Sequence, residues 1–356
     1  MADETGPVLA GGLVCPVPTT QYDRVQLGHG SGGKMSAALL KDRFLPALGN
    51  PVLKELGDAA VVGIGPSEVA ISTDTFVVSP LEFPGGNIGS LAVHGTLNDL
   101  SMMGARPLYL TAGFVLEEGL PFDVLDRIVA AMGAAAHEAG VPVVTGDTKV
   151  VERGKADGVF INTTGIGLRR AGFSPGPARA RPGDAVVVSG MIGRHGIAIM
   201  SARENLGFEV QVESDSANLY PLVERLRAAL GGAIHVLRDP TRGGVASSLN
   251  EIAAASNVGI QLEEGALPVP GPVAAACEML GLDPLYVANE GILLAFVPAP
   301  FAEEAVEALR MHSLGREARV IGRVVNEHPG MVVLKTAIGG TRVVDMLPGD
   351  QLPRIC

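Results

Sequence analysis

Four aspartates in the first half of the chain could together bind a divalent cation. Hard cations such as magnesium prefer carboxylate oxygens, and magnesium commonly joins one or two carboxylates to nucleotide phosphates. Each aspartate taken alone is better explained as a helix cap or a turn residue, because Asp is favoured at both. We therefore treat the four as one candidate metal set: Asp58, Asp74, Asp99 and Asp147.

A glycine-rich stretch near the start could bind the phosphates of a nucleotide. Four glycines fall between Gly28 and Gly33, and backbone N–H groups at glycines can turn toward an anion because no Cβ is in the way. The stretch from Gly28 to Lys34 fits GxxxxGK, but Met35 stands where a Walker A motif needs Ser or Thr. We reject a Walker site and predict a different phosphate-binding loop, with a flexible linker as the alternative.

Two polar segments in the second half could handle phosphate and protons. Residues 238–244 place Arg238 and Arg242 before an expected helix, and arginines with a helix N-terminus can hold phosphate oxygens. A salt-bridged turn is the alternative. Glu290 interrupts the apolar run 285–296, where it is either part of a surface hairpin or a general base. In the first half, Lys149 follows two residues after an aspartate and would be drawn toward phosphate.

The chain ends on a cysteine, Cys356. The other two cysteines are Cys15 and Cys277, and the three form no CxxC pair, so neither a disulfide framework nor a cysteine zinc site is indicated. The α-carboxylate of the same residue disfavours the thiolate and makes Cys356 a poor unaided nucleophile. We interpret Cys356 as a carrier that another group loads. A frayed chain end is the alternative.

The elements that must position these residues fall into two halves. The first half carries β-rich runs at 59–64, 69–79, 108–115, 141–145 and 159–167, with helical spacing at 88–104 and 121–139. In the helix 88–104, His94 and Asn98 share a face. The second half predicts helices at 196–206, 217–230, 244–256, 271–280 and 301–310, and strands at 185–189, 258–263, 285–297 and 318–325. The irregular order of strands and helices favours an α+β fold.

The domain limits follow from composition. A segment rich in Pro and Gly, 169–183, is the expected linker between the halves. We predict a mobile arm at 1–26, an N-terminal domain at 27–168, a C-terminal α+β domain at 184–336 and a flexible tail at 337–356.

Charge and hydropathy exclude several classes of function. The net charge is −11, and no cluster of Lys and Arg forms the basic face that a nucleic-acid-binding protein needs. An acidic protein that handles phosphate must therefore recruit metal cations. The first residues form neither a basic nor an apolar leader, and no apolar run reaches the roughly 18 residues of a membrane span. We predict a soluble, cytoplasmic protein with reduced thiols.

Taken together, the motifs resemble the HypE family of hydrogenase maturation carbamoyl dehydratases, within the superfamily of aminoimidazole ribonucleotide synthetase and selenophosphate synthetase. Their order and joint presence are specific, and the terminal cysteine separates this family from its superfamily relatives. The resemblance covers nearly the whole chain. It rests on the segments 29–33, 84–89, 96–105, 145–150, 238–244 and 289–291 and on the final Pro353-Arg354-Ile355-Cys356.

The resemblance implies a PurM-like homodimer whose N-terminal domains pair and bind ATP and Mg²⁺ between them. Cys356 would accept a carbamoyl group from the carbamoyltransferase HypF and, after dehydration to a thiocyanate, donate cyanide to iron on the HypC–HypD complex. Glu290 would be the base, with Lys149 assisting. The aspartates named above would hold the metal, and the nucleotide would contact Gly30, Ser31, Gly32, Gly33, Asn98 and Thr148.

Two positions depart from the family pattern, and two other functions compete. Arg194 stands where the family has Asp, and Asn218 stands where it has Pro, so we assign no role to the neighbouring His195 or Asp215. One rival function is a superfamily phosphotransferase or synthetase acting on a free small molecule. The other is a nucleotide-regulated scaffold that only presents Cys356 to partners.

Overall fold

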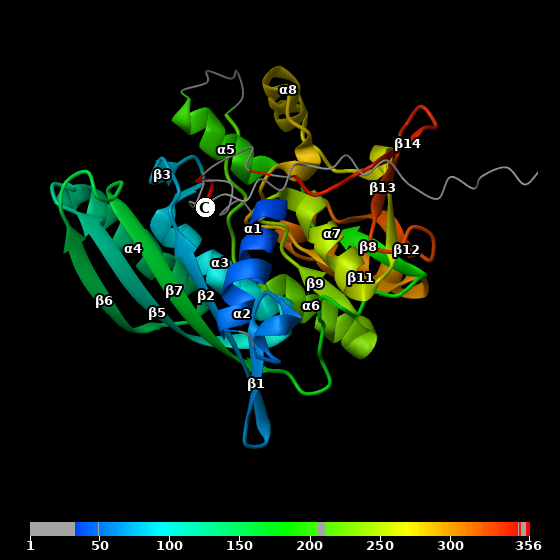
Figure 1. Ribbon diagram of the computed structural model, residues 1–356, viewed down its shortest axis with the longest axis horizontal. Helices are drawn as coiled ribbons and strands as arrows, with labels where there is room; N and C mark the ends of the chain where they lie inside the picture. Colours follow the sequence, from blue (N-terminus) through cyan, green and yellow to red (C-terminus); the bar gives the residue numbers. More distant parts are fainter. Residues whose placement is uncertain (1–32, 49, 205–210, 348, 350–353) are drawn as a thin grey trace, which may run out of the picture.

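Two β-sheets, one in each half of the chain, organise the structure, which is a computed structural model (Figure 1). It describes residues 33–48, 50–204, 211–347, 349 and 354–356. Figure 1 shows the N-terminal sheet on the left and the C-terminal sheet on the right. None of the described helices is long and apolar enough to cross a membrane.

The N-terminal sheet has five strands in the order β1-β2-β7-β5-β6. Its pairs are antiparallel except for β5 and β6, which run parallel. Two helices, α3 (Ile88–Met102) and α4 (Phe122–Ala139), belong to this domain; α3 packs on β2, β7 and β5, and α4 packs on α3. The strands are β1 (Ala60–Ile64), β2 (Ser67–Phe76), β5 (Ala105–Glu117), β6 (Val143–Val151) and β7 (Val159–Arg169).

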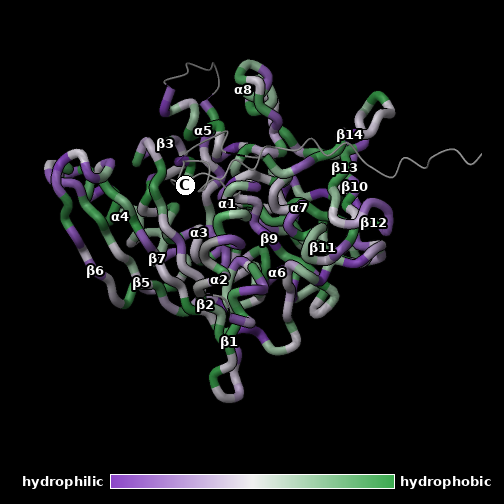
Figure 2. The backbone as a smooth tube through the Cα atoms, in the orientation of Figure 1, coloured by the Kyte–Doolittle hydropathy of each residue, from purple (hydrophilic) through white to green (hydrophobic). Residues whose placement is uncertain are grey.

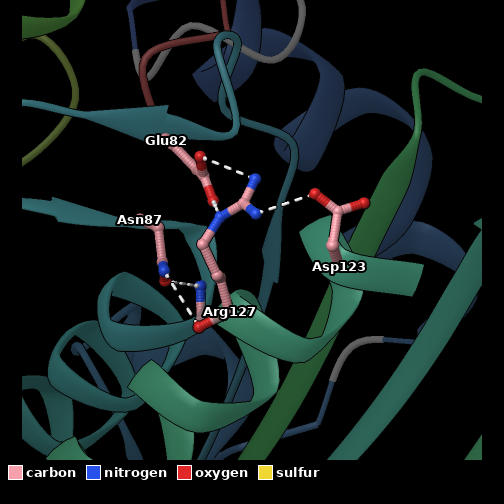
Figure 3. Close-up of polar contacts among 5 residues, drawn as sticks. Glu82, Asn87, Asp123 and Arg127 are labelled. Carbon is pink, nitrogen blue, oxygen red and sulfur yellow. Dashed lines mark hydrogen bonds and ion pairs between the residues drawn. The ribbon is translucent and has the colours of Figure 1, made fainter. Parts of the chain in front are cut away.

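A small hairpin joins β2 to α3. It consists of β3 (Glu82–Phe83) and β4 (Gly86–Asn87), and Asn87 begins α3 with a capping box in which its side chain accepts hydrogen bonds from Gly89 N and Ser90 N. Arg127 of α4 bonds Glu82 at 2.7 Å and Asp123 at 2.9 Å (Figure 3). The hairpin is therefore held against α4 at one end and against α3 at the other.

The C-terminal sheet has seven strands in the order β14-β13-β10-β12-β8-β11-β9. Its central strands are buried on both faces; all five residues of β8, for example, are buried. The strands are β8 (Asp184–Val188), β9 (Val236–Arg238), β10 (Gly259–Glu263), β11 (Leu294–Pro298), β12 (Arg319–Val325), β13 (Val332–Lys335) and β14 (Thr341–Val343). The helices are α5 (Arg194–Arg203), α6 (Tyr220–Leu230), α7 (Gly244–Ser256), α8 (Gly271–Leu280) and α9 (Ala302–Arg310).

One hydrophobic core crosses from the first domain into the second. It packs Phe76, Ile88 and Leu91 of the N-terminal domain with Ile197 of α5 and with Ile355, the second-last residue of the chain. Ile355 is only 3% exposed. The end of the chain is thus packed where the two domains meet, as Figure 1 shows by the position of the C-terminus near α5 and β3.

Several element predictions were wrong. The apolar run 285–297 is a strand only from Leu294; the part before it is a short 3-10 turn and a loop, although its side chains are buried. The strand predicted at 141–145 runs instead over Val143–Val151, so that Asp147 lies within a strand. The helical segment from Lys34 to Leu48, with a π-helical turn at Leu40–Phe44, was not predicted, and neither was β9.

Candidate functional site

Three aspartates from both domains form a carboxylate cluster. Asp58, Asp99 and Asp239 each place a carboxylate oxygen within 4.8 Å of the others. They come from the turn before β1, from α3 and from the turn after β9. Ser72 of β2 donates a hydrogen bond of 2.5 Å to Asp99. The fold therefore joins residues that are far apart in the sequence.

Asp74 of β2 lies close to this cluster. Its side chain is on the same side of the sheet as Ser72, two residues earlier in the strand. Burial, together with the negative charge of Asp74, raises the pKa of Asp99 well above its ordinary value. Burial also raises the pKa of Asp74 itself. Three of the four predicted metal ligands are thus near one another, and Asp239 is the member that the sequence did not single out.

The cluster fits a divalent cation. Burial raises the pKa of Asp239 to about 6 and that of Asp58 to about 8, although Arg238 opposes the shift at both carboxyls. Within the described chain, Asp239 Oδ2 is buried and has no hydrogen-bond partner. Buried carboxylates are normally paired or coordinate a metal. This donor set is the hard oxygen type that Mg²⁺ prefers.

Two arginines border the cluster. Arg238 forms ion pairs with Asp58 and, at 2.7 Å, with Glu251 of α7. For this arginine the alternative interpretation, a salt-bridged turn, is therefore correct. The pKa of Arg242 is raised, first by its Coulombic interaction with Cys356 and then with Asp74 and Glu290. The guanidinium of Arg242 is therefore close enough to the end of the chain and to these carboxylates to interact with their charges.

Glu290 faces this site from a buried loop. The carboxylate of Asp215 accepts hydrogen bonds from Glu290 N at 3.2 Å and Gly291 N at 3.0 Å, which fixes the loop's main chain. A Cβ at Gly291 would lie 1.6 Å from Asp215 O, so only glycine fits there. Burial, with the charges of Asp239 and Asp215, raises the pKa of Glu290 well above its usual range. A carboxylate with a raised pKa is a stronger base.

Asn289 ties the same loop to its surroundings. Its side-chain oxygen accepts a hydrogen bond of 2.7 Å from Gly193 N at the start of α5, and its Nδ2 donates one of 2.9 Å to Pro240 O. The motif 289–291 and the turn 238–244, which were separate in the sequence, are therefore one structural unit. This unit carries Glu290, Asp239 and Arg242.

The end of the chain is docked beside this unit. Val77 N donates to Cys356 O at 3.0 Å, and Ser79 N donates to Arg354 O at 3.2 Å, so the tripeptide 354–356 pairs with the segment that follows β2. Arg354 also forms an ion pair with Asp157. The mobility of the tail 337–356 stays a prediction; in this structure its residues Thr341–Val343 form β14, and its last three residues pair with the segment that follows β2.

Asp147, Thr148 and Lys149 lie apart from the cluster. They are on β6, the edge strand, with β7 and β5 between it and β2. The register places Asp74, Thr163, Ala112 and Gly146 in one row across these strands, about 14 Å from end to end at the usual strand spacing. Asp147 is one residue further, so its side chain points to the opposite face, where Lys149 bonds it at 2.6 Å and lowers its pKa.

The predicted nucleotide contacts have different positions. Gly30, Ser31 and Gly32 lie outside the described residues, and Gly33 is the N-cap of α1 (Lys34–Leu39). Asn98 is fully buried: its Oδ1 accepts from Leu219 N at 2.8 Å and its Nδ2 donates to Ala217 O at 3.0 Å. His94 bonds Ser216 at 3.0 Å, so both residues of this helix face hold the segment 216–219. Contact of nucleotide with the glycine-rich segment, Asn98 and Thr148 stays a prediction.

The sequence did not indicate that Asp239 joins the carboxylate cluster, and it indicated no role for Asp215 or His195. A signal for Asp239 exists, because it lies between two arginines in the turn 238–244, which is predicted to bind phosphate. For Asp215 and His195 no local pattern existed, since their partners lie many residues away in the chain: Glu290 and Gly291 for one, Ile355 for the other.

Both domains match known families. Residues 56–169 match the model for AIR synthase related protein, N-terminal domain, and residues 181–335 match the C-terminal domain of the same family. Carbamoyl dehydratase HypE of Azotobacter vinelandii is 56% identical over 332 residues, covering 93% of this chain and 97% of that protein. This chain belongs to the HypE family of carbamoyl dehydratases.

Solved structures of the HypE family agree with this assignment. A HypE chain in a HypE–HypF complex superposes with a TM-score of 0.83 at 48% identity, covering 87% of this chain and 100% of that one. A HypE in complex with ATP gives a TM-score of 0.78 at 52% identity, covering 92% of this chain and 98% of that one. The predicted two-domain PurM-like α+β architecture is confirmed.

The raised carboxyl pKa values predict how stability depends on pH. Between the ordinary aspartate pKa of 3.8 and the raised values of about 6 for Asp239 and about 8 for Asp58, the folded protein binds more protons than the unfolded chain. The free energy of unfolding of the metal-free protein should therefore fall as pH rises through this range. Mg²⁺ should reduce the slope, because a bound cation favours charged carboxylates.

Thermal unfolding midpoints between about pH 5 and about pH 9, with EDTA or with Mg²⁺, test this expectation. Asp239→Asn should make the unfolding midpoint depend less on pH in EDTA, and Mg²⁺ should change that dependence less than it does in the wild type. Asp126→Asn, at an exposed position on α4, is the control and should change neither. A midpoint that stays constant or rises with pH in EDTA would contradict the electrostatic account.

Proposed function

We propose that this protein uses ATP to dehydrate a carbamoyl group on Cys356 to a thiocyanate, which then supplies cyanide to iron during hydrogenase maturation. The observation that carries the proposal is the docking of Cys356 near Arg242, whose charge also interacts with those of Asp74, Asp99 and Glu290. Family membership supports it, because the HypE relatives are named for this reaction. A substrate attached to the chain's own end explains why that end lies in the site.

The chemistry requires a better leaving group than hydroxide. The γ-phosphoryl group of ATP is transferred to the carbamoyl oxygen, and that oxygen then leaves as part of phosphate while the two N–H protons are removed. The products are S–C≡N on Cys356, ADP, phosphate and a proton. Because the negative charge on the transferred phosphoryl group must be offset, positioned cations contribute most of the catalysis.

The residues of the site divide these tasks. Arg242 lies close to Cys356 and can hold the phosphorylated carbamoyl group near the base. Glu290 takes the N–H protons, and its raised pKa suits it to such a weak acid. Mg²⁺, held by Asp58, Asp99 and Asp239 with Asp74 beside them, would neutralise the phosphates of ATP.

Loading the protein with a carbamoyl group and adding ATP tests the proposal. The mass of the C-terminal peptide should fall by one water for each ATP hydrolysed, whereas other peptides keep their mass. A nucleotide-regulated scaffold would show no mass change. A phosphotransferase acting on a free small molecule would consume ATP without any change at Cys356.

We infer that two copies pair through the open face of the N-terminal sheet. A row of large apolar side chains, Ile71, Ile166 and Tyr109, crosses three neighbouring strands on the face away from α3, and each is 37% exposed or more. The edge strand β6 is exposed along nearly its whole length and carries both apolar and charged residues (Figure 2). Pairing would cover this face and bring the partner's β6, with Asp147, Thr148 and Lys149, toward the nucleotide.

Ile166→Asp should convert the dimer to a monomer, because it places a charge in the middle of the apolar row. Sedimentation equilibrium measures the change. Ile64→Asp is the matched control, since Ile64 is 60% exposed at the tip of the β1–β2 hairpin, away from this row. If Ile166→Asp stays dimeric while Ile64→Asp becomes monomeric, the pairing face is wrong.

The tail can also serve partner proteins. Asn250 holds Val344 by a hydrogen bond of 2.8 Å to its carbonyl, and the 12 residues that follow in the sequence could span about 40 Å when extended. That reach lets Cys356 receive a carbamoyl group from HypF and deliver cyanide to a HypC–HypD complex. We propose that these exchanges take place in the cytoplasm.

A further inference from the structure

We propose that His195 and Ser214 form a latch that grips the main chain of the docked tail and positions Cys356 for dehydration. The inference deepens the proposed function, because it says how the substrate-bearing residue is held. Neither residue received a role from the sequence. Both are buried: His195 has no exposed surface and Ser214 is 7% exposed.

The hydrogen bonds of the latch are directional. His195 Nε2 lies 2.8 Å from Ile355 O, and its Nδ1 lies 2.7 Å from the hydroxyl of Ser214. Because the carbonyl of Ile355 can only accept, Nε2 must carry the proton, and Nδ1 then accepts from the Ser214 hydroxyl. Burial lowers the pKa of His195 to about 4, which keeps the ring neutral and fixes this tautomer. Ser214 thus orients the ring that holds the tail.

The β3–β4 hairpin makes a second set of contacts with the His195 ring and with Ser214. Phe83 of the β3–β4 hairpin packs edge-on against the His195 ring at 5.6 Å, and Ser214 N donates to Pro84 O at 2.8 Å. At Gly85 a Cβ would lie 2.8 Å from Ser214 O, and its φ of +94° is one that residues with a side chain rarely adopt. Pro84 and Gly85 of the motif 84–89, which carry no reactive group, therefore support the latch.

Three further hydrogen bonds hold the main chain of the tail. Val77 N bonds Cys356 O, Ser79 N bonds Arg354 O, and Arg203 of α5 donates to Arg354 O at 2.7 Å. The side chain of Ile355 is buried in the core that crosses the domains. None of these bonds uses the sulfur of Cys356. The latch can therefore hold the tail whether the sulfur is a thiol, a thiocarbamate or a thiocyanate, and it fixes the position of the group without selecting its chemistry.

The experiment measures how often the last residues of the tail leave their docked position. The full-length protein without ATP is treated with iodoacetamide, and alkylation of the C-terminal peptide is followed by mass spectrometry. His195→Phe keeps the aromatic contact with Phe83 but cannot donate to Ile355 O, so alkylation of Cys356 should be about tenfold faster than in the wild type. His195→Gln, which can place an amide donor near Nε2, should restore much of the protection.

Two controls separate undocking from unfolding. Cys277 is buried in α8, and its alkylation reports loss of the fold, so it should not change in His195→Phe. His235→Gln alters another buried histidine, which bonds Asp184 at 2.8 Å within the C-terminal domain, and it should leave Cys356 as protected as in the wild type. If Cys277 is alkylated faster in His195→Phe than in the wild type, two other variants are used in its place, Ser214→Ala and Arg203→Gln. Each should speed alkylation of Cys356.

A catalytic readout tests positioning. In carbamoylated His195→Phe, the single-turnover rate of water loss should fall by about tenfold while the Kd for ATP stays within about twofold of the wild type. Alkylation of Cys356 within about twofold of the wild type, or a Gln variant as unprotected as the Phe variant, would overturn the latch. Alkylation does not depend on dehydration, so failure of the proposed function and failure of the latch are distinguishable.

Discussion

Replacing Cys356 with alanine will abolish ATP turnover in the presence of the carbamoyl donor but leave ATP binding intact. The change removes one sulfur atom from a residue whose main chain bonds Val77 N, so the tail should stay docked. Without the sulfur there is no carbamoyl oxygen to accept the γ-phosphoryl group. Phosphate release measures turnover, and isothermal titration measures the Kd for ATP.

Cys277→Ala is the matched control for this prediction. Cys277 lies buried in α8, and burial raises the pKa of its thiol to about 11, so it is a poor nucleophile. The variant should turn over like the wild type, apart from a modest loss of stability from the cavity that it leaves. If Cys356→Ala still hydrolyses ATP when carbamoylated partner is present, the carrier role of the terminal cysteine is wrong.

Glu290→Gln should stop the reaction after Cys356 has been loaded. The amide keeps the size of the side chain, and the Asp215 contacts are made to the main chain of Glu290 and Gly291, so the loop should retain its structure. It cannot accept the N–H protons, and loss of a general base typically slows a reaction by about 10²–10⁴-fold. The carbamoyl adduct should therefore accumulate on the C-terminal peptide.

Single-turnover mass spectrometry distinguishes the loaded from the dehydrated peptide. Glu303→Gln, at an exposed position in the first turn of α9, is the control and should behave like the wild type. Glu290 would not be the base if the Gln variant lost water at a rate close to that of the wild type. A variant that cannot be loaded at all would also refute the assignment, because loading does not require this base.

The fold class could be predicted from the sequence because local apolar patterns indicate the helices and strands, and whole motifs indicate the family. The helices around His94 and after Gly244 follow from apolar spacing, and the family resemblance follows from whole motifs such as the terminal Pro-Arg-Ile-Cys. The run 285–297 misled because apolar residues are equally suited to a buried loop. There, Asn289 Nδ2 donates to Val287 O and Asp215 accepts from Gly291 N, which satisfies backbone groups that a strand would have paired with a neighbour.

The site could be predicted only in part, because its members meet through tertiary contacts. Asp58 and Asp99 come together through β1, β2 and α3, but no spacing reveals that the end of β9 brings Asp239 to them. Asp147 looked equivalent to Asp74, yet the order of strands in the sheet and the alternation of side chains place it on the other face. That these aspartates bind Mg²⁺ stays a prediction.

The most direct test of the proposed chemistry follows the carbamoyl oxygen. Cys356 is loaded with a carbamoyl group that contains a heavy oxygen isotope, and one turnover is started with ordinary ATP and Mg²⁺ in ordinary water. If ATP phosphorylates that oxygen, the isotope must appear in the released phosphate and the peptide must end as a thiocyanate. Unlabelled phosphate, with the isotope recovered in water or kept on the peptide, would contradict the account.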